Sequence, residues 1–310
     1  MIITVTPNPA LDRTLTVPKL VFDEMVRASD SRLDLDGKGV NVSKALHALG
    51  AATLIMGFAG GPAGEQLERG LAAQGFATEF TRVAGGTRTN TIIIDAATNR
   101  YVKANEPGPT LRPDELAAFF AQARERVRPS DTWILSGSLP PGAPADFYAD
   151  VVRLVQAGGA RALLDTSGDP LRRGSAAGPY LVKPNAGEAH ELTGQPIAAD
   201  EDALRAATFF HDQGVELVAL SLGADGLLLA SRAAAVRARP PRVVALNPVG
   251  AGDALLAGIA WALERGLSLP EVARWGVASG TAAAMRAGTS AAPRREVEAL
   301  YAQVDIAMVG

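Results

Sequence analysis

The stretch "NPVGAGDALLAG", residues 247–258, places two glycines just before a carboxylate and an apolar run. Because Gly250 and Gly252 lack side chains, the backbone can turn its N–H groups toward a ligand. If a helix follows, its positive dipole end completes an anion hole formed by Gly250, Ala251 and Gly252. Asp253 then lies beside the anion and can accept a proton from an attacking hydroxyl. The alternative, equally supported by this motif alone, is that Asp253 is only a favourable charge in a first helical turn.

The composition narrows the class of protein. With 310 residues the chain suffices for one large domain, 47% of the residues are hydrophobic, and the net charge is −3. This charge gives no reason to expect nucleic acid or an anionic membrane as a partner. The absence of cysteine excludes disulfides, thiol catalysis and a Cys-ligated metal. The first residues lack a signal-peptide pattern and the apolar runs are too short to cross a bilayer, so we expect a cytoplasmic protein.

Short apolar runs alternate with longer amphipathic stretches. Such alternation predicts an α/β fold of three layers, with a mostly parallel central sheet and helices on both faces. Residues 113–127 are predicted as one of these helices, with Pro113 at its start and Leu116, Phe119 and Phe120 on one face. The predicted strands are 2–6, 53–59, 132–137, 160–166, 180–185 and 216–222.

Two segments interrupt this alternation. Residues 11–35 and 87–105 show partial period-two patterns, and the second contains a hairpin turn signal at 97–99. Strands at these positions do not readily join a parallel sheet, so we expect a small separate β-sheet that covers a cleft as a lid. No linker long enough to divide the chain is present, and residues 1–310 are interpreted as a single domain.

Two further loops have the composition of a nucleotide site. In "KPNAGE" (183–188), Asn185 and Glu188 lie three residues apart and could hold water around a Mg²⁺ ion. The same spacing is typical of a helix capping box, and taken alone the capping box is the better interpretation. "SLGADG" (221–226) is either a hairpin turn or a wall of a nucleotide pocket.

A third group of residues suits a sugar. "LDGKGVNVSKALHALG" (35–50) offers flexible backbone and a polar side chain at a helix start, and Asp12 adds an acceptor near the lid. Each of these residues could instead serve only turn chemistry. A sugar that bears a phosphate would need additional cationic and hydroxyl partners, although surface cations are usually just solvated. The candidates for that phosphate are Lys38, Arg88, Lys103 and Ser138.

Taken together, these motifs resemble those of the ribokinase-like (PfkB-type) carbohydrate kinases over essentially the whole chain. Within that family the chain is similar to the branch that contains 1-phosphofructokinases, tagatose-6-phosphate kinases and minor 6-phosphofructokinases. One motif would be weak, but eight in the family's order are specific. They are "TPNPALD", "GKGVNV", "TRTN", "NEPGP", "SGSLPPG", "KPN" with Glu188 following, "SLGADG" and "VGAGD".

The resemblance implies a role for each matching position. Asp253 is the implied catalytic base, with the backbone of Gly250, Ala251 and Gly252 as the anion hole. Asn185 and Glu188 are implied to organise Mg²⁺ through water. The implied ATP-binding residues are Lys183, Asn185, Ser221, Gly223 and Gly226. The implied sugar-binding residues are Asp12, Gly37, Gly39 and Asn41, with Lys38, Arg88, Lys103 and Ser138 toward the sugar phosphate. The resemblance also implies a homodimer formed through the lid and a monovalent cation such as K⁺ near the catalytic loop.

Three positions depart from the general family pattern. Asp36-Gly37-Lys38-Gly39 replaces two adjacent glycines, and Lys38 is typical of the phosphofructokinase branch. Pro248 occupies a position where many members have threonine. Val102 and Lys103 replace a frequent threonine and glutamate, which bears on the choice of sugar.

The expected activity is transfer of a phosphoryl group from ATP to fructose 1-phosphate. The alternatives are a tagatose-6-phosphate or fructose-6-phosphate kinase, a kinase of an unphosphorylated sugar, and a non-catalytic sugar-phosphate sensor on the same fold. A histidine-based or metal-dependent hydrolase is disfavoured because His47, His190 and His211 have no ligand spacing.

Overall fold

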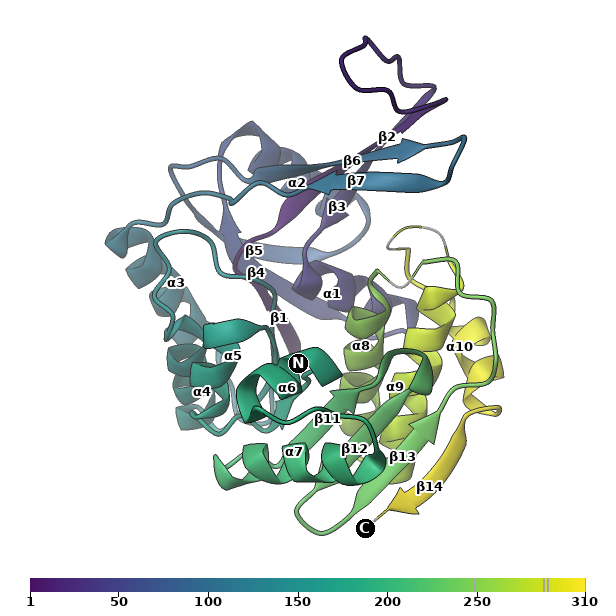
Figure 1. Ribbon diagram of the computed structural model, residues 1–310. Coiled ribbons are helices and arrows are strands. Elements are labelled where there is room, and N and C mark those ends of the chain that lie inside the picture. The colour runs from purple at the N-terminus through teal and green to yellow at the C-terminus, as the bar shows by residue number, and fades with distance from the viewer. Residues whose placement is uncertain (248, 287, 289, 310) are drawn as a thin grey trace.

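The computed structural model covers residues 1–310 and describes all of them except 248, 287, 289 and 310. The described chain contains a ten-stranded sheet and a separate four-stranded sheet (Figure 1). The ten-stranded sheet has the spatial order β14 (Asp305–Val309), β13 (Ala235–Arg239), β12 (Leu227–Ser231), β11 (Leu217–Ser221), β10 (Leu181–Val182), β9 (Arg161–Asp165), β8 (Thr132–Ser136), β1 (Ile2–Thr6), β4 (Thr53–Ala59) and β5 (Ala77–Arg82).

The central sheet is parallel from β5 through β11 and antiparallel at the other edge, where β11, β12, β13 and β14 pair in turn. The predicted mostly parallel sheet is therefore confirmed. The strand predicted over 180–185 is wrong in extent, because β10 covers only Leu181–Val182. Pro184 has no N–H to continue a ladder, and Asn185 keeps only an isolated bridge to Ser221.

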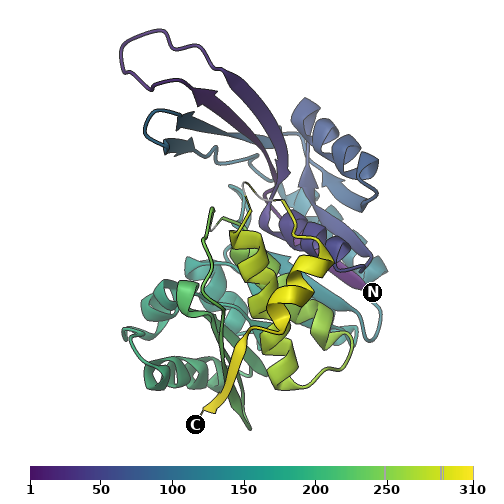
Figure 2. The same ribbon diagram turned by 90° about the vertical axis from the view of Figure 1, so that its right-hand side faces the viewer.

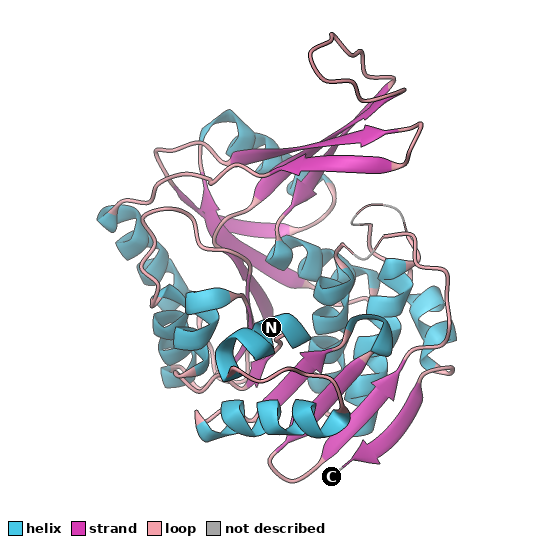
Figure 3. Cartoon of the chain, viewed as in Figure 1, coloured by secondary structure: helices cyan, strands magenta, loops and turns pink. Residues whose placement is uncertain are grey.

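Helices cover both faces of the sheet (Figure 3), as the sequence predicts. The alternation along β8 shows why: Ile134 packs against one helical layer, whereas Trp133 and Leu135 pack against the other. Burial of each such side chain contributes about 1.5–3 kcal/mol. One layer contains α1 (Lys38–Ala48), α2 (Gly61–Ala73), α8 (Ala251–Leu263), α9 (Leu269–Ala284) and α10 (Arg294–Tyr301). The other contains α3 (Pro113–Arg126), α4 (Phe147–Ala157), α5 (Gly168–Ser175), α6 (Ala186–Thr193) and α7 (Asp200–Asp212).

The four-stranded sheet is built from the two segments that the sequence analysis set apart. Its order is β3 (Asp30–Asp36), β2 (Ala10–Val17), β6 (Arg88–Asp95) and β7 (Arg100–Ala104), and we call it the lid sheet. Figures 1 and 2 show it at one end of the molecule, with the loop between β2 and β3 projecting beyond it. The hairpin between β6 and β7 turns at residues 96–99, where Asn99 has a φ of 53°, so the predicted turn is confirmed.

No α-helix in the described part of the chain combines the length and the hydropathy that crossing a bilayer requires.

Candidate active site

The candidate site lies at the carboxyl ends of the parallel strands, the edge where α/β sheets bind their ligands. Asp165 is the last residue of β9, Lys183 follows β10 directly, and Ser221 ends β11. The N-terminus of α8 points to the same edge, because Gly252 lies beside Lys183: a Cβ added to this glycine would be 3.5 Å from Lys183 Nζ. Segments far apart in the sequence therefore meet here.

Asp253 lies in the first turn of α8, which begins after Gly250 in the left-handed conformation with a φ of 84°. Its side chain is buried, and Asn41 Nδ2 donates a hydrogen bond to its Oδ2 over 3.1 Å. Burial and the negative charge of Asp165 raise the pKa of Asp253 to about 7, against the lowering effects of Lys38, Asn41 and Lys183. A carboxyl group with this pKa can both take and release a proton near neutral pH.

Two lysines share one buried carboxylate next to Asp253. Lys38 Nζ lies 3.1 Å and Lys183 Nζ 3.2 Å from Asp165 Oδ1, and Asp165 is fully buried. Burial acts to lower the pKa of Lys38, but the charges of Asp165 and Asp253 raise it to about 12. The ammonium group of Lys38 therefore stays charged, and the side chains of Lys38 and Lys183 lie together beside the α8 N-terminus, an arrangement that favours a bound phosphate.

The lid side of the site holds a second polar group. Asp12 on β2 accepts hydrogen bonds from Asn90 over 2.7 Å and from Lys103 over 3.0 Å. Asp36, at the end of β3, accepts a 2.8 Å hydrogen bond from Asn41 Nδ2. The pKa of Asp36 is raised by burial and by the charge of Asp12. The side chains of the lid and of α8 thus meet through Asn41.

Arg88 and Lys103, two of the cations proposed for a sugar phosphate, lie near this group. Arg88 donates a hydrogen bond to the carbonyl oxygen of Asn8 over 2.9 Å. Burial lowers the pKa of its guanidinium, although the negative charges of Asp12 and Asp36 act to raise it. Lys103 pairs with Asp12. Ser138 is exposed and follows Gly137, where an added Cβ would lie 3.7 Å from Lys38 Cβ.

Close backbone approach explains the glycines before and within α1. A Cβ on Gly39 would lie 2.3 Å from Thr6 Oγ1, and Gly37 has a φ of 140°. No side chain fits between the start of α1 and the end of β1, and this approach places Lys38 and Asn41 over the sheet edge.

A pocket of about 640 Å³ opens beside the α8 N-terminus. Its polar end is formed by Gly252, Ala251 and the β11–β12 turn, including Ser221, Gly223 and Gly226. Its apolar walls are Val243, Leu255, Val277 and Ala284. The "SLGADG" segment therefore forms both a hairpin turn, with a 3₁₀ turn at Gly223–Asp225, and a wall of this pocket. This lining suits an apolar ring joined to an anionic chain.

Asn185 and Glu188 form the capping box that the sequence favoured. Asn185 Oδ1 accepts from the Glu188 N–H over 2.8 Å, and Glu188 Oε2 accepts from the Asn185 N–H over 2.9 Å. Glu188 also contributes to the raised pKa of Lys38, so its charge acts within the site. Asp165 Oδ2 is buried without a hydrogen-bond partner among the described residues. Oxygen atoms of this kind fit a hard divalent cation held partly through water.

The histidines lie apart from this site. His47 packs its ring against Phe76, with ring centroids 5.1 Å apart, and His190 is exposed on α6. His211 is buried, with Nδ1 2.9 Å from the carbonyl oxygen of Val215. Within the part of the chain that the structure describes, no cluster of three or more His, Asp or Glu side chains could hold a metal directly.

Sequence reasoning missed Asp165 and Asp36. The signal for Asp165 was available, because "LLDT" ends a buried strand with a carboxylate at the functional edge. Pro248, noted above as a departure, lies outside the described residues.

A proton acceptor held beside an anion-binding helix end can activate a hydroxyl against a phosphoryl group, so fold and site define a phosphotransferase of the α/β class. The chain matches the model of the pfkB family carbohydrate kinases over residues 8–295, and it belongs to that family. It is thus a carbohydrate kinase, with an alcohol group as the phosphoryl acceptor, and the family implies ATP with a divalent metal ion.

Individual relatives cover nearly the whole chain. A 1-phosphofructokinase of Rhodobacter capsulatus is 38% identical over 306 residues, which span 98% of this chain and 97% of that protein. The ATP-dependent 6-phosphofructokinase isozyme 2 of Mycobacterium tuberculosis is 35% identical, over 97% of this chain and 88% of the relative. The crystal structure of phosphofructokinase-2 from Escherichia coli in complex with potassium superposes with a TM-score of 0.93 at 29% identity, covering 97% and 98% of the two chains.

Proposed function

We propose that this protein transfers the γ-phosphoryl group of ATP to the free primary hydroxyl of fructose 1-phosphate, giving fructose 1,6-bisphosphate and ADP. The observation that carries the proposal is the position of Asp253, a buried carboxyl group of pKa about 7 next to Gly252, which lines the 640 Å³ pocket. The choice of sugar is supported by the 38% identity to a 1-phosphofructokinase over nearly the full length of both proteins.

In the proposed reaction Asp253 takes the proton of the sugar hydroxyl as its oxygen attacks the γ-phosphorus. The bond between that phosphorus and the β–γ bridging oxygen breaks, and ADP leaves. The first N–H groups of α8 have no partner inside the helix and are free to hold the transferring phosphoryl group. Asn41 keeps Asp253 oriented through the 3.1 Å hydrogen bond, and Lys38 and Lys183 offset the charge of the phosphates.

The sugar is proposed to lie between the lid sheet and the start of α1. Asp12, Asn41 and the backbone at Gly37 and Gly39 would bind its hydroxyls, with Arg88, Lys103, Lys38 and Ser138 toward its phosphate. The ion pair between Lys103 and Asp12 implies that this lysine exchanges partners when the sugar phosphate binds. Residues 1–310 would then act as one domain, with the lid sheet excluding water from the reaction.

Mg²⁺ is the divalent ion we propose, held through water by Asn185 and Glu188, and it would neutralise charge on the phosphates when bound. ATP would lie in the 640 Å³ pocket, with Ser221, Gly223 and Gly226 along its wall and Lys183 and Asn185 near its phosphates. A monovalent cation near the catalytic loop is supported by the potassium complex of the Escherichia coli relative. A homodimer through the lid and a cytoplasmic location remain predictions. A tetrameric inhibited form exists for the Escherichia coli protein.

A second candidate activity is phosphorylation of fructose 6-phosphate, favoured by the 35% identity to a 6-phosphofructokinase. A coupled ADP-release assay against fructose 1-phosphate, fructose 6-phosphate, tagatose 6-phosphate, fructose and ribose separates the two. The proposal expects the highest kcat/KM with fructose 1-phosphate. Preference for an unphosphorylated sugar would contradict the roles given to Arg88 and Lys103, and absence of turnover with every sugar would contradict the kinase itself.

A further inference from the structure

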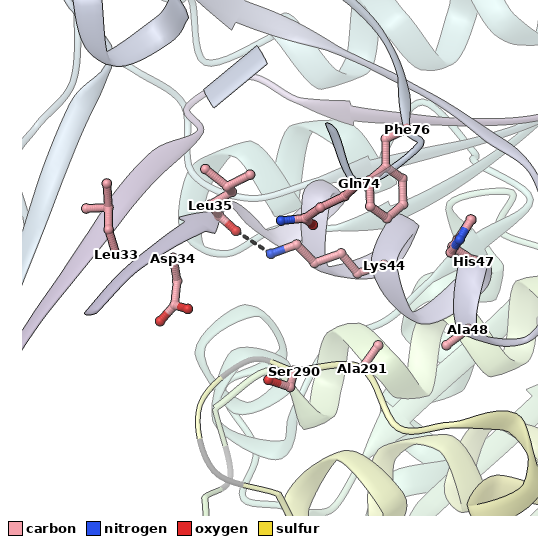
Figure 4. Close-up of a pocket in the computed structure, with 10 residues that line it drawn as sticks. All are labelled: Leu33, Asp34, Leu35, Lys44, His47, Ala48, Gln74, Phe76, Ser290 and Ala291. Atoms are coloured by element: carbon pink, nitrogen blue, oxygen red, sulfur yellow. Dashed lines mark hydrogen bonds between the residues drawn. The ribbon is translucent and has the colours of Figure 1, made fainter. Parts of the chain in front are cut away.

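A second cavity, of about 380 Å³, lies behind α1 and is not part of the site described above (Figure 4). Its walls come from β3 of the lid sheet, from the outer side of α1, from the segment after α2, and from residues 290–291. The polar side chains along it are Asp34, Lys44, His47, Gln74 and Ser290. None of them has a role in the proposed phosphoryl transfer.

Lys44 dominates the charge of this cavity. Its ammonium group donates to the carbonyl oxygen of Leu35, drawn as a dashed line in Figure 4, and this is its hydrogen bond within the described structure. No carboxylate of the described residues lies within ion-pair distance of Lys44 Nζ. An ammonium group has three N–H donors, so two of them lack a protein acceptor. Burial lowers the pKa of Lys44, although the charges of Asp36, Asp34 and Asp12 act to raise it, and the residue is half-buried.

The remaining groups of the wall supply hydrogen-bond donors and one carboxylate. Asp34 is the only carboxylate among the residues of the wall, and Arg32 Nε binds it over 2.8 Å. His47 and Gln74 are exposed at the opening, and the His47 ring is held against the buried Phe76. An ammonium, an imidazole and an amide that line one polar cavity can donate to the acceptor oxygens of a small anion.

We propose that this cavity binds a small oxyanion, a phosphate or carboxylate group, with Lys44 as its principal partner and His47 and Gln74 at its edge. A ligand of this kind would use the free donors of Lys44 and compete with the carbonyl of Leu35. The cavity would therefore act on the strand that leads into the active site.

The path from the cavity to the active site is short and consists of bonded groups. Leu35 is followed by Asp36, which accepts from Asn41, which in turn donates to Asp253. Leu35 is also held from the other side, because a Cβ added to Gly70 of α2 would come within 2.7 Å of Leu35 Cδ1. A change in the Lys44–Leu35 contact therefore acts on Asp36 and Asn41. This coupling rests on the proposed function, whereas the binding does not.

The three histidines of the chain allow a direct test of binding by NMR. The intact protein is titrated at constant pH with inorganic phosphate, and separately with citrate, while the imidazole C–H signals are followed. We expect a saturable shift of His47 with at least one probe, while buried His211 stays unchanged. Binding at the nucleotide site would instead move His190 on α6. The probe that acts identifies the phosphate or the carboxylate as the better ligand.

Lys44→Met should abolish the His47 shift, and Lys19→Met, which removes the same charge from an exposed position, should leave it intact. If Lys44→Met does not fold, Lys44→Arg, which keeps the charge, is titrated in its place. Absence of a His47 shift with both probes, or a shift that persists in Lys44→Met, overturns the site. For the coupling, the saturating probe should change the KM for the sugar phosphate about five-fold or more in the parent and not in Lys44→Met. An unchanged KM with a clear His47 shift overturns the coupling alone.

Discussion

Replacing Asp253 by asparagine should make the protein more stable and nearly inactive. In the parent, the pKa of Asp253 is raised from 3.8 to about 7, chiefly by burial. The unfolded chain therefore loses this proton near pH 4, whereas the folded protein keeps it until about pH 7. Because the folded state binds the extra proton between these values, the free energy of unfolding falls as the pH rises through this range. Below pH 4 the carboxyl group of Asp253 is protonated in both the folded and the unfolded state, so it does not lower the free energy of unfolding.

The pKa difference sets the size of the effect. From 3.8 to about 7, at 1.36 kcal/mol for each pH unit, the ionised carboxylate costs the fold roughly 4 kcal/mol above pH 7. Asparagine has the same shape without the charge. Asp253→Asn should therefore match the parent at pH 4 and exceed its free energy of unfolding by up to roughly 4 kcal/mol at pH 8.5. Turnover should fall by about 10²–10⁴-fold, the usual contribution of a positioned base.

Urea denaturation of both proteins at pH 4 and pH 8.5, with the ADP-release assay alongside, measures both effects. Asp212→Asn, at an exposed aspartate that ends α7, is the matched control for removal of one carboxylate charge. A stability difference for Asp253→Asn that is the same at both pH values would refute the buried, high-pKa carboxylate. Turnover within a factor of a few of the parent would refute its role as base.

Three further substitutions test the remaining parts of the site. Glu188→Gln should raise the Mg²⁺ concentration needed for half-maximal turnover, whereas Glu271→Gln weakens an equivalent capping box on α9 and should cost similar stability without this change. Arg88→Met should raise the KM for the sugar phosphate at least ten-fold, on the order of the loss of one charge-assisted hydrogen bond, and should change the KM for ATP little. A larger effect on the KM for ATP would contradict the placement of Arg88 at the sugar phosphate. Arg82→Met, at an exposed ion pair, should leave both constants unchanged. Gly250→Ala forces a side chain into a φ of 84°, and should cost about 1 kcal/mol and lower kcat more than it raises KM for ATP.

The parallel part of the fold could be predicted from the sequence because its strands are continuous apolar runs. The predicted bounds of β1 and β4 agree with the observed ones. The strands β13 and β14 were missed, since "AVRAR" and "DIAMV" are short and carry charges. Arg237, for example, is buried on β13 because it pairs with Asp200 of α7. A partner 37 residues away cannot be seen in a local pattern.

The candidate site shows the same limit. Glycine motifs and strand-end residues could be recognised singly, so the backbone of the site was predictable. The interactions that set its charges could not be, because Lys38, Asp165 and Lys183 come together only through the order of the strands. Lys38 was assigned to the sugar phosphate alone, whereas in the structure it first balances a buried aspartate. The capping box at Asn185 was predicted correctly, because both of its partners lie within one helical turn.

The central place of β1 has a consequence for how the protein is made. All five residues of this strand are buried, and Ile2 pairs with Thr53 on one side and Thr132 on the other. The ribosome adds about 5–20 residues per second, so β8, the strand that contains Thr132, emerges on the order of ten seconds after β1. The nascent chain must carry an unpaired apolar strand for that time, and we expect chaperones that bind such segments to raise the yield of folded kinase.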